Sequence, residues 1–362
     1  MTALQIQARR VLKVDTRYVV ARRFSSDILA SNIFFPPDPS EFRSDQVWVE
    51  DTAYTMRRQP GIAGPDGMFP TVQFRTAGQL QWDIPLRMLR IINSDLENAD
   101  TDPSLTPRKR NLKVALFKHR LERNIAAWAV LKNPSIMTQN ITLGPGQRFD
   151  DLASAASDPI AVMRYGAEKV FRGTGLKITD IDIPTPIMRK LKSHEKVMSY
   201  SVNTLNLSKD RPIDAAIIEQ LIGYDYIEPG AIKVESFTFN NTADSPYTTD
   251  QDDQTYCTGP NVIMAARAVP GGTEGDDNGF GLGKYMALLD KAMPDDPTVQ
   301  IATGNDGMGV LEVPNYDVAG GGTTTQVISL WAPFVQNPKA AFAIYGAANA
   351  ADTASYDKSL QF

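Results

Sequence analysis

Two strand-like segments near the start of the chain predict a long β-hairpin. Residues 46–59 and 69–84 are rich in β-branched and aromatic residues, and the Pro- and Gly-rich segment PGIAGPDGM lies between them. Apolar residues occur on both faces of each strand, and a two-stranded ribbon is only marginally stable alone in water. We therefore expect this hairpin to lie against another copy of the chain.

The strongest helical pattern covers residues 106–132. Thr106 before Pro107 is typical of a helix start, and Asn133-Pro134 ends the pattern. A helix of this length would be about 40 Å long. The apolar positions recur at spacings of three and four and form the stripe Val114, Phe117, Leu121, Ile125, Trp128 and Leu131. The basic flank expected beside this stripe consists of Lys109, Lys113, Arg120 and Arg123.

Helices alternate with strands from residue 157 onward. The first helix begins after Ser157 or Asp158 and ends at Gly173 and Gly175. A strand at 176–183, a short proline-opened helix, a helix in RPIDAAIIEQLIG and a strand in AIKVESF follow. Two such helix–strand units predict a mixed α/β domain with helices packed on a sheet. Beyond it, NVIMAARAV, TQVISLWAPFV and KAAFAIYGAAN are expected to be apolar strands.

Composition narrows the class of protein. The chain has 362 residues, 42% of them hydrophobic, which is enough for a substantial core in one or two domains. A formal net charge of −5 gives no global excess that would indicate a nucleic-acid or membrane partner. The single cysteine, Cys257, cannot form an intrachain disulfide. No segment has the apolar length of a membrane span or the pattern of a signal peptide, so we expect a soluble protein made inside the cell.

The two histidines offer little for catalysis. His119 lies in the long helical pattern and His194 in SHEKV, and neither belongs to a Gly-x-Ser-x-Gly or Cys/His motif. His194-Glu195 begins like the zinc motif H-E-x-x-H, but Met198 stands where the second histidine is required. We expect both histidines to be structural and the chain to be no enzyme, without a cofactor or metal.

The segment GFGLGKY at residues 279–285 is the best phosphate-binding candidate, because glycine backbone and Lys284 can both contact a phosphate. It lacks the spacing of a P-loop and the Ser or Thr after the lysine. A surface loop is therefore favoured over a nucleotide-binding enzyme built around Gly279 to Lys284. Two acidic runs without EF-hand spacing are expected to be solvated loops. These runs are Asp250, Asp252 and Asp253, and Asp276, Asp277 and Asn278.

A basic arm opens the chain. Residues 1–25 hold six Lys or Arg residues, including Arg9, Arg10 and Lys13, against Asp15 as their one acidic residue. Such an arm can order against a partner, or it can be a solvated terminus; the charge is compatible with both. The arm and the basic flank of the long helix offer sequence-independent contact with phosphates, since neither has interleaved aromatic residues for base stacking.

In this order, the elements resemble the major capsid protein of tailed bacteriophages, whose fold encapsulin shells share. The most telling segment is DPIAVMRYGAEKVFRGTGLKITDIDIPTPIMRKLKSHEKV, followed by IDAAIIEQLIGYDYIEPGAIKV. The resemblance implies an α+β capsid fold with an N-terminal arm at 1–30 and an extended hairpin loop at 46–85. It further implies a peripheral domain at 31–45, 86–150 and 325–362, with a spine helix at 106–132, and an axial domain at 151–324.

The resemblance also implies a function: a structural subunit that self-assembles into hexamers and pentamers of an icosahedral shell around double-stranded DNA. Its expected place is the virion capsid, assembled in the host cytoplasm with a portal, a separate scaffolding protein and a possible decoration protein. The alternative is an encapsulin-like compartment with a protein cargo. The expected intersubunit contacts of the hairpin are Trp48, Tyr54, Met56, Phe69, Val72 and Phe74. The expected contacts on the inner surface are Arg9, Arg10, Lys13, Lys109, Lys113, Arg120 and Arg123.

The sequence departs in two features from some proteins of the family that it resembles, and both features bear on how the shell is assembled and held together. Some capsid proteins crosslink through a lysine in the extended loop, whereas residues 46–84 contain Arg57, Arg58 and Arg75 but no lysine. Crosslinking by that route is therefore excluded, and the shell must be held by noncovalent overlap or by a decoration protein. Other relatives begin with a long scaffolding segment, whereas here Met1 stands almost directly before the arm, so a separate scaffolding protein is expected.

Overall fold

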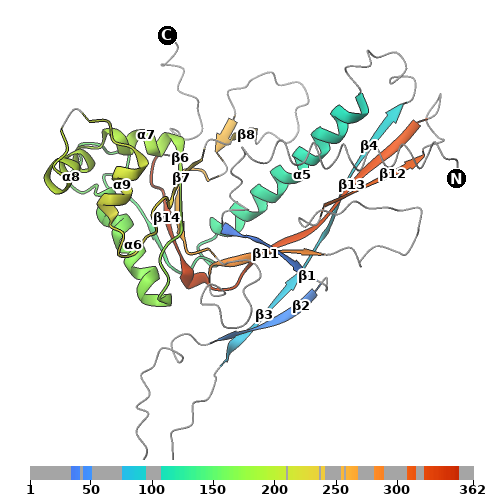
Figure 1. Ribbon diagram of the computed structural model, residues 1–362, viewed down its shortest axis with the longest axis horizontal. Coiled ribbons are helices and arrows are strands. Elements are labelled where there is room, and N and C mark those ends of the chain that lie inside the picture. The colour runs from blue at the N-terminus through green and yellow to red at the C-terminus, as the bar shows by residue number, and fades with distance from the viewer. Residues whose placement is uncertain are drawn as a thin grey trace, which may run out of the picture.

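The computed structural model describes residues 34–40, 44–50, 76–94, 107–208, 211–235, 238–240, 254–256, 258–267, 281–288, 308–314 and 322–349. The described elements extend in three directions (Figure 1). A layer of helices on a sheet forms one end, a long helix and a long sheet run to the opposite end, and a two-stranded ribbon points away from both. The expected N-terminal arm lies outside the described residues.

One five-stranded sheet is built around the longest strand, β13 (Gly322–Val335). The first half of β13 lies between β4 (Leu86–Ser94) and β12 (Met308–Pro314), both antiparallel to it. Its second half pairs with β11 (Gly283–Leu288), and β1 (Pro37–Ser40) pairs with β11 in parallel. Segments that are far apart in the sequence are therefore joined along a single strand.

The other five-stranded sheet has buried central strands. Its order is β5 (Asn140–Thr142), β14 (Ala341–Tyr345), β10 (Val262–Ala265), β6 (Asp180–Pro184) and β7 (Ile232–Glu235). The three apolar strands expected in the last hundred residues are confirmed as β10, β13 and β14. The expected domain boundaries remain predictions, but strand pairing crosses them, because β5 and β14 join the sheet that contains β6 and β7.

Three helices pack on this sheet, α6 (Pro159–Thr174), α7 (Thr185–Ser193) and α9 (Ala215–Ile222), and α8 (Glu195–Leu205) packs on α7 and α9 at the outer end of the layer (Figure 1). The carboxylate of Asp158 accepts a hydrogen bond from the backbone N–H of Ala161, so Asp158, rather than Ser157, is the N-cap of α6. Gly173 lies inside α6, and the helix ends at Gly175, whose φ of 75° suits glycine.

The central strands β10 and β14 serve two hydrophobic cores at once. Successive side chains of a strand point to opposite faces. In β14, Phe342 and Ile344 pack under α6, α7 and α9, whereas Ala341 and Ala343 pack with Trp128 of the long helix. In β10 the same alternation sends Val262 and Met264 to one core and Ile263 and Ala265 to the other. The sheet is thus the wall between the two cores.

The expected long helix is confirmed as α5 (Pro107–Leu131). Its buried face differs from the expected stripe, because Leu121 and Ile125 are only partly buried. The first half of the buried face packs on β13, whereas its last residues pack with β10 and β14. The buried residues of α5 are Leu112, Ala115, Leu116, His119, Arg123, Asn124, Ala127, Trp128 and Leu131. Polar residues therefore occupy the middle of this face, where apolar periodicity could not find them. At its end, the carbonyl of Leu131 accepts a hydrogen bond from the hydroxyl of Tyr345, and burial raises the pKa of Tyr345 to about 12.

The ribbon is formed by β2 (Ser44–Glu50) and β3 (Thr76–Asp83), which pair antiparallel from Ser44 opposite Asp83 onward. These strands form a sheet of their own, separate from both five-stranded sheets. The predicted hairpin is confirmed at its base, and residues 51–75 lie outside the described part. A second short ribbon is formed by β8 (Thr238–Asn240) and β9 (Gln254–Tyr256).

Gly283 is required by close backbone packing. A Cβ atom at this position would lie 2.2 Å from the carbonyl oxygen of Phe334 on β13, which is too close for any side chain. We predict that Gly283→Ala separates β11 from β13 and lowers the free energy of unfolding by about 1–3 kcal/mol, the usual cost of overpacking. Urea denaturation of the unassembled subunit measures the free energy of unfolding of each variant. The matched control is Gly144→Ala, since a Cβ there meets nothing nearer than 4.0 Å. Equal stability of the two variants would contradict the prediction.

Candidate functional site

The expected intersubunit residues fall mostly outside the described part of the chain. Trp48 lies in β2, directly opposite Gln79 of β3. The register shifts between Val49 and Glu50, which indicates a bulge at the point where the ribbon leaves its paired base. Tyr54, Met56, Phe69, Val72 and Phe74 lie outside the described residues, so their role in contacts between subunits stays a prediction.

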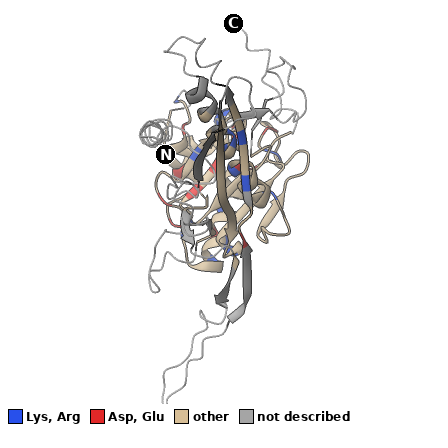
Figure 2. Cartoon of the chain, turned by 90° about the vertical axis from the view of Figure 1, so that its right-hand side faces the viewer, with Lys and Arg blue, Asp and Glu red and all other residues tan. Residues whose placement is uncertain are grey.

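The expected basic flank of α5 is not a single exposed surface. Lys109 and Lys113 are confirmed as residues of α5. Arg120 is partly buried, and Arg123 is only 3% exposed on the face toward β13 and β4. A buried guanidinium does not present its charge at the surface of the subunit, so the contact of Arg123 with a partner stays an unsupported prediction. Lys and Arg are interspersed with Asp and Glu on the side of the molecule that Figure 2 shows, without a dominant sign. Arg9, Arg10 and Lys13 lie outside the described residues.

His119 joins the long helix to the long strand. Its Nε2 lies 2.9 Å from the carbonyl oxygen of Val327, and its Nδ1 lies 2.9 Å from the hydroxyl of Ser329. A carbonyl can only accept, so Nε2 carries the proton and Nδ1 accepts from Ser329. Burial is the main cause that lowers the pKa of His119. The neutral ring thus fixes the register of α5 against β13.

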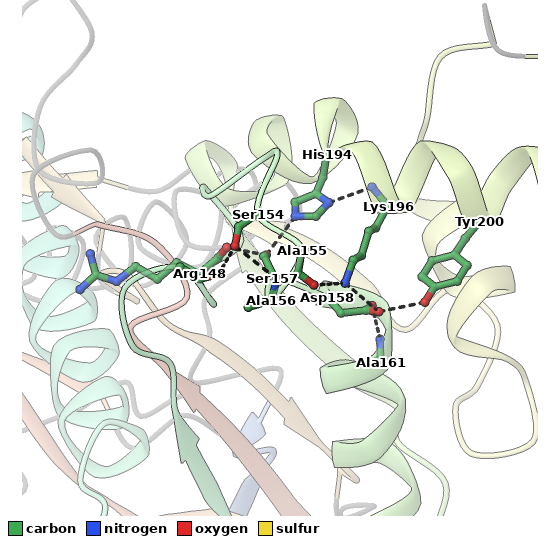
Figure 3. Close-up of polar contacts among 11 residues, drawn as sticks. Arg148, Ser154, Ala155, Ala156, Ser157, Asp158, Ala161, His194, Lys196 and Tyr200 are labelled. Carbon is green, nitrogen blue, oxygen red and sulfur yellow. Dashed lines mark hydrogen bonds and ion pairs between the residues drawn. The ribbon is translucent and has the colours of Figure 1, made fainter.

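His194 is the centre of a second buried polar network, which sequence reasoning did not find (Figure 3). Its Nε2 lies 3.0 Å from the hydroxyl of Ser157, and that hydroxyl donates to the carbonyl of Arg148 at 2.7 Å. Its Nδ1 accepts from the backbone N–H of Lys196 at 3.2 Å, so His194 is the N-cap of α8. No sequence motif links Ser157 to His194, because only the tertiary fold brings the segment before α6 next to the start of α8.

This serine–histidine pair is oriented for structure and not for catalysis. A hydroxyl has one proton, and that of Ser157 points to the carbonyl of Arg148. His194 must therefore donate from Nε2 to Ser157, whereas a general base must accept the proton of its nucleophile. The ring is also fully buried, out of reach of a substrate. The expectation that His194 is structural fits this geometry, and so does the pair of hydrogen bonds that His119 makes.

The remaining candidates from the sequence are the glycine-rich segment, metal ligands and membrane-spanning helices. Gly283 and Lys284 belong to strand β11, so the end of the expected surface loop is wrong at these two residues. Gly283 is there because β13 approaches closely, and a phosphate loop would instead lead into a helix. Among the residues that the structure describes, no three His, Cys, Asp or Glu side chains group closely enough to hold a metal ion. No helix in that same part of the chain has the length and apolar character to cross a membrane.

Comparisons with known proteins identify the fold. No protein-family model matches the sequence, and no curated protein matches it. A solved structure of a phage-related protein from Bordetella bronchiseptica RB50 matches with a TM-score of 0.63 at 14% identity, over 93% of this chain and 97% of that one. The capsid structure of the cyanophage P-SCSP1u matches with a TM-score of 0.51 at 9% identity, over 90% of this chain and 92% of that one.

Both matches extend over nearly the whole of each chain, so the likeness concerns the complete architecture and not one sheet. The chain has the fold of the phage major capsid protein, as its order of elements suggested. The expected α+β capsid fold is confirmed. At these identities the comparison establishes the fold, and the function has to be argued separately.

His119 gives a prediction for stability and its pH dependence. His119→Leu leaves the Ser329 hydroxyl and the Val327 carbonyl buried without a partner, so we expect a loss of about 2–3 kcal/mol in the free energy of unfolding at neutral pH. Because the folded state lowers the pKa of His119, its contribution is complete above the ordinary value of 6.5 and disappears as the pH falls through the lowered value. Denaturant titrations of the unassembled subunit between about pH 7.5 and about pH 5 measure both effects.

The matched control is His119→Gln, whose amide can still donate to Val327 but does not titrate in this range. It should lose less stability than the leucine variant and flatten the acid limb of the pH profile. If the glutamine and leucine variants are equally stable, the hydrogen bond to Val327 does not join α5 to β13 as described.

Proposed function

We propose that this chain is the structural subunit of an icosahedral bacteriophage capsid, which self-assembles into hexamers and pentamers and encloses double-stranded DNA. The observation that carries the proposal is the correspondence of fold over 90% of the chain with the capsid structure of a cyanophage. The virion capsid is its proposed location, with assembly in the host cytoplasm.

The three-directional arrangement of the described elements supports a role in contacts between copies. A two-stranded ribbon is only marginally stable alone in water, and strand β4 exposes Met88 and Ile92, so both elements would gain stability if neighbours covered them. A subunit held at several interfaces leaves a shell far more slowly than it leaves any one contact, because re-engagement is local. Closure of the shell removes the remaining free edges.

The two five-stranded sheets suggest that the described elements belong to two domains. In this proposal, the sheet from β5 to β7 with α6–α9 forms the axial domain around the centre of a capsomer, so β5 and β14 move to this domain from the peripheral domain expected from the sequence. Helix α5 with β4, β12 and β13 forms the peripheral domain, to which β12 moves from the expected axial domain, and the ribbon that begins with β2 and β3 forms the extended loop. The division is supported by the two separate cores on the two faces of the β10–β14 wall.

The same proposal implies that the subunit has partners other than further copies of itself. A separate scaffolding protein directs assembly, a portal provides the entry for DNA, and a decoration protein is an optional stabiliser. Arg9, Arg10 and Lys13 are proposed to contact the packaged DNA through its phosphates, without sequence preference. The absence of lysine from residues 46–84 supports a shell held by noncovalent contacts.

The hairpin is the first test of the proposal. We predict that Trp48→Asp, Tyr54→Asp and Phe69→Asp together leave a folded subunit that does not assemble, because charges replace aromatic contacts. Light scattering measures particle size, and circular dichroism reports folding. The matched control carries Trp48→Phe, Tyr54→Phe and Phe69→Tyr, which keep the aromatic surface and should assemble normally. Shells of normal size from the aspartate variant would contradict the hairpin assignment.

The contents of the particle separate the virus from the encapsulin-like alternative. We predict that particles purified with the co-expressed phage proteins keep nucleic acid after nuclease treatment, because the shell excludes the enzyme. The ratio of absorbance at about 260 nm to that at about 280 nm measures this, since nucleobases absorb more strongly at the first wavelength and aromatic side chains at the second. Nucleic-acid-free particles that hold a protein cargo would favour the compartment, and a chain that stays monomeric would overturn both.

A further inference from the structure

Helix α8 buries few of its side chains. Val197 and Ser201 are its buried residues, among 11 in the helix, and Leu205 packs against the same core as Val197. Helix α9, by contrast, buries five of its eight residues, including Ile217, Ile218 and Leu221. An element with few buried apolar side chains opens at a lower free energy than its neighbours. The polar network at the first turn of α8 therefore adds to a small apolar contact.

That network connects α8 to the segment before α6 at several points (Figure 3). The ammonium of Lys196 donates to the carbonyl of Ala155 at 2.7 Å and lies 3.6 Å from a carboxylate oxygen of Asp158. The hydroxyl of Tyr200 donates to the same oxygen at 2.8 Å. These groups are exposed or only partly buried at the rim, whereas His194 lies fully buried at the centre, with both ring nitrogens bonded.

We propose that His194 is an acid-sensitive latch: protonation of its imidazole releases α8 from the segment before α6 while the rest of the fold stays intact. This inference concerns the folded subunit and does not depend on its forming a shell. No covalent step is involved, since the change is the uptake of one proton at Nδ1.

The geometry explains why one proton is sufficient. In the neutral ring, Nδ1 accepts from the backbone N–H of Lys196 and caps the first turn of α8. A protonated ring has an N–H at both nitrogens, so Nδ1–H would face the N–H of Lys196 and the cap would be lost. The positive charge would also be buried, and a buried charge without a partner is expensive.

The charges around His194 oppose one another. Asp158, from the N-terminus of α6, and Glu195, from α8 itself, favour the protonated ring, whereas the ammonium of Lys196 disfavours it. Burial outweighs them and lowers the pKa of His194. The neutral ring is therefore the form that fits the closed network, and the latch is closed near neutral pH and opens on acidification.

Hydrogen exchange of the full-length unassembled subunit tests the proposal. Backbone exchange is followed by mass spectrometry at about pH 7.5 and about pH 5, with correction for the intrinsic pH dependence of the chemistry. We expect peptides of α8 to lose protection at the acidic pH, because opening of α8 is coupled to proton uptake by His194. Peptides of α9 should keep their protection. Equal protection of α8 at both pH values would overturn the proposal.

Three variants assign the effect to one side chain. His194→Asn keeps a good N-cap acceptor without a titratable ring, so α8 should stay protected at both pH values. His119→Gln removes the other histidine and should leave the acid response of α8 unchanged. Asp158→Asn keeps the cap of α6 and removes a carboxylate that favours the protonated ring, so the response should move to lower pH. A response that survives His194→Asn, or that moves to higher pH with Asp158→Asn, would overturn the assignment.

If His194→Asn does not fold, a second measurement tests the proposal on the wild-type chain. Exchange of the ring C2 proton reports the protonation midpoint of each histidine in the wild-type chain, and separate peptides distinguish His119 from His194. We expect the midpoint of His194 to coincide with the pH at which α8 loses backbone protection. Midpoints that differ by more than about one unit, a tenfold difference in proton affinity, would overturn the proposal.

Discussion

The structure depends on a sheet that is buried on both faces. Strands β10 and β14 send alternate side chains into two different cores. A shift of either strand by one residue would therefore move every side chain of that strand into the wrong core. Phe342 fills the space under α6 so closely that a Cβ atom on Gly166 would lie 2.5 Å from its ring. The opposite face carries small alanines, which let Trp128 of the long helix and Trp331 of the long strand pack together. This wall fixes the helical layer relative to α5 and β13.

Two elements extend away from the wall. The β2–β3 ribbon pairs only with itself in the described part of the chain, and the far half of α5 packs on β13 through a small cluster of Leu112, Ala115, Leu116 and Val327. In the proposed shell, neighbouring subunits would cover these elements.

Each of the two histidines joins elements that are far apart in the sequence or in different helices. His119 joins α5 to β13 where the helix face is polar, and His194 joins α8 to the segment before α6. Each ring is buried and neutral, donates from Nε2 and accepts at Nδ1. Apolar packing alone tolerates small shifts in register, whereas a two-sided hydrogen bond does not, because a buried donor left without its partner costs free energy. Burial lowers the pKa of both rings, so we expect both junctions to weaken on acidification.

Local chemistry determined much of this protein from its sequence. The helix from Pro107 to Leu131, the cap at Asp158, the stop at Gly175 and the buried strands β10 and β14 follow from proline, carboxylate, glycine and apolar patterns within a few residues of each element. Their order along the chain was enough to suggest the capsid fold. The tertiary structure decided what depends on distant partners. Arg123 is buried on the side of α5 where His119 bonds to β13, Gly283 is needed because Phe334 approaches it, and Ser157 meets His194 because the fold brings the segment before α6 next to the start of α8. No periodicity encodes such pairings, since the partners lie far apart in the sequence and meet only when the sheet has assembled.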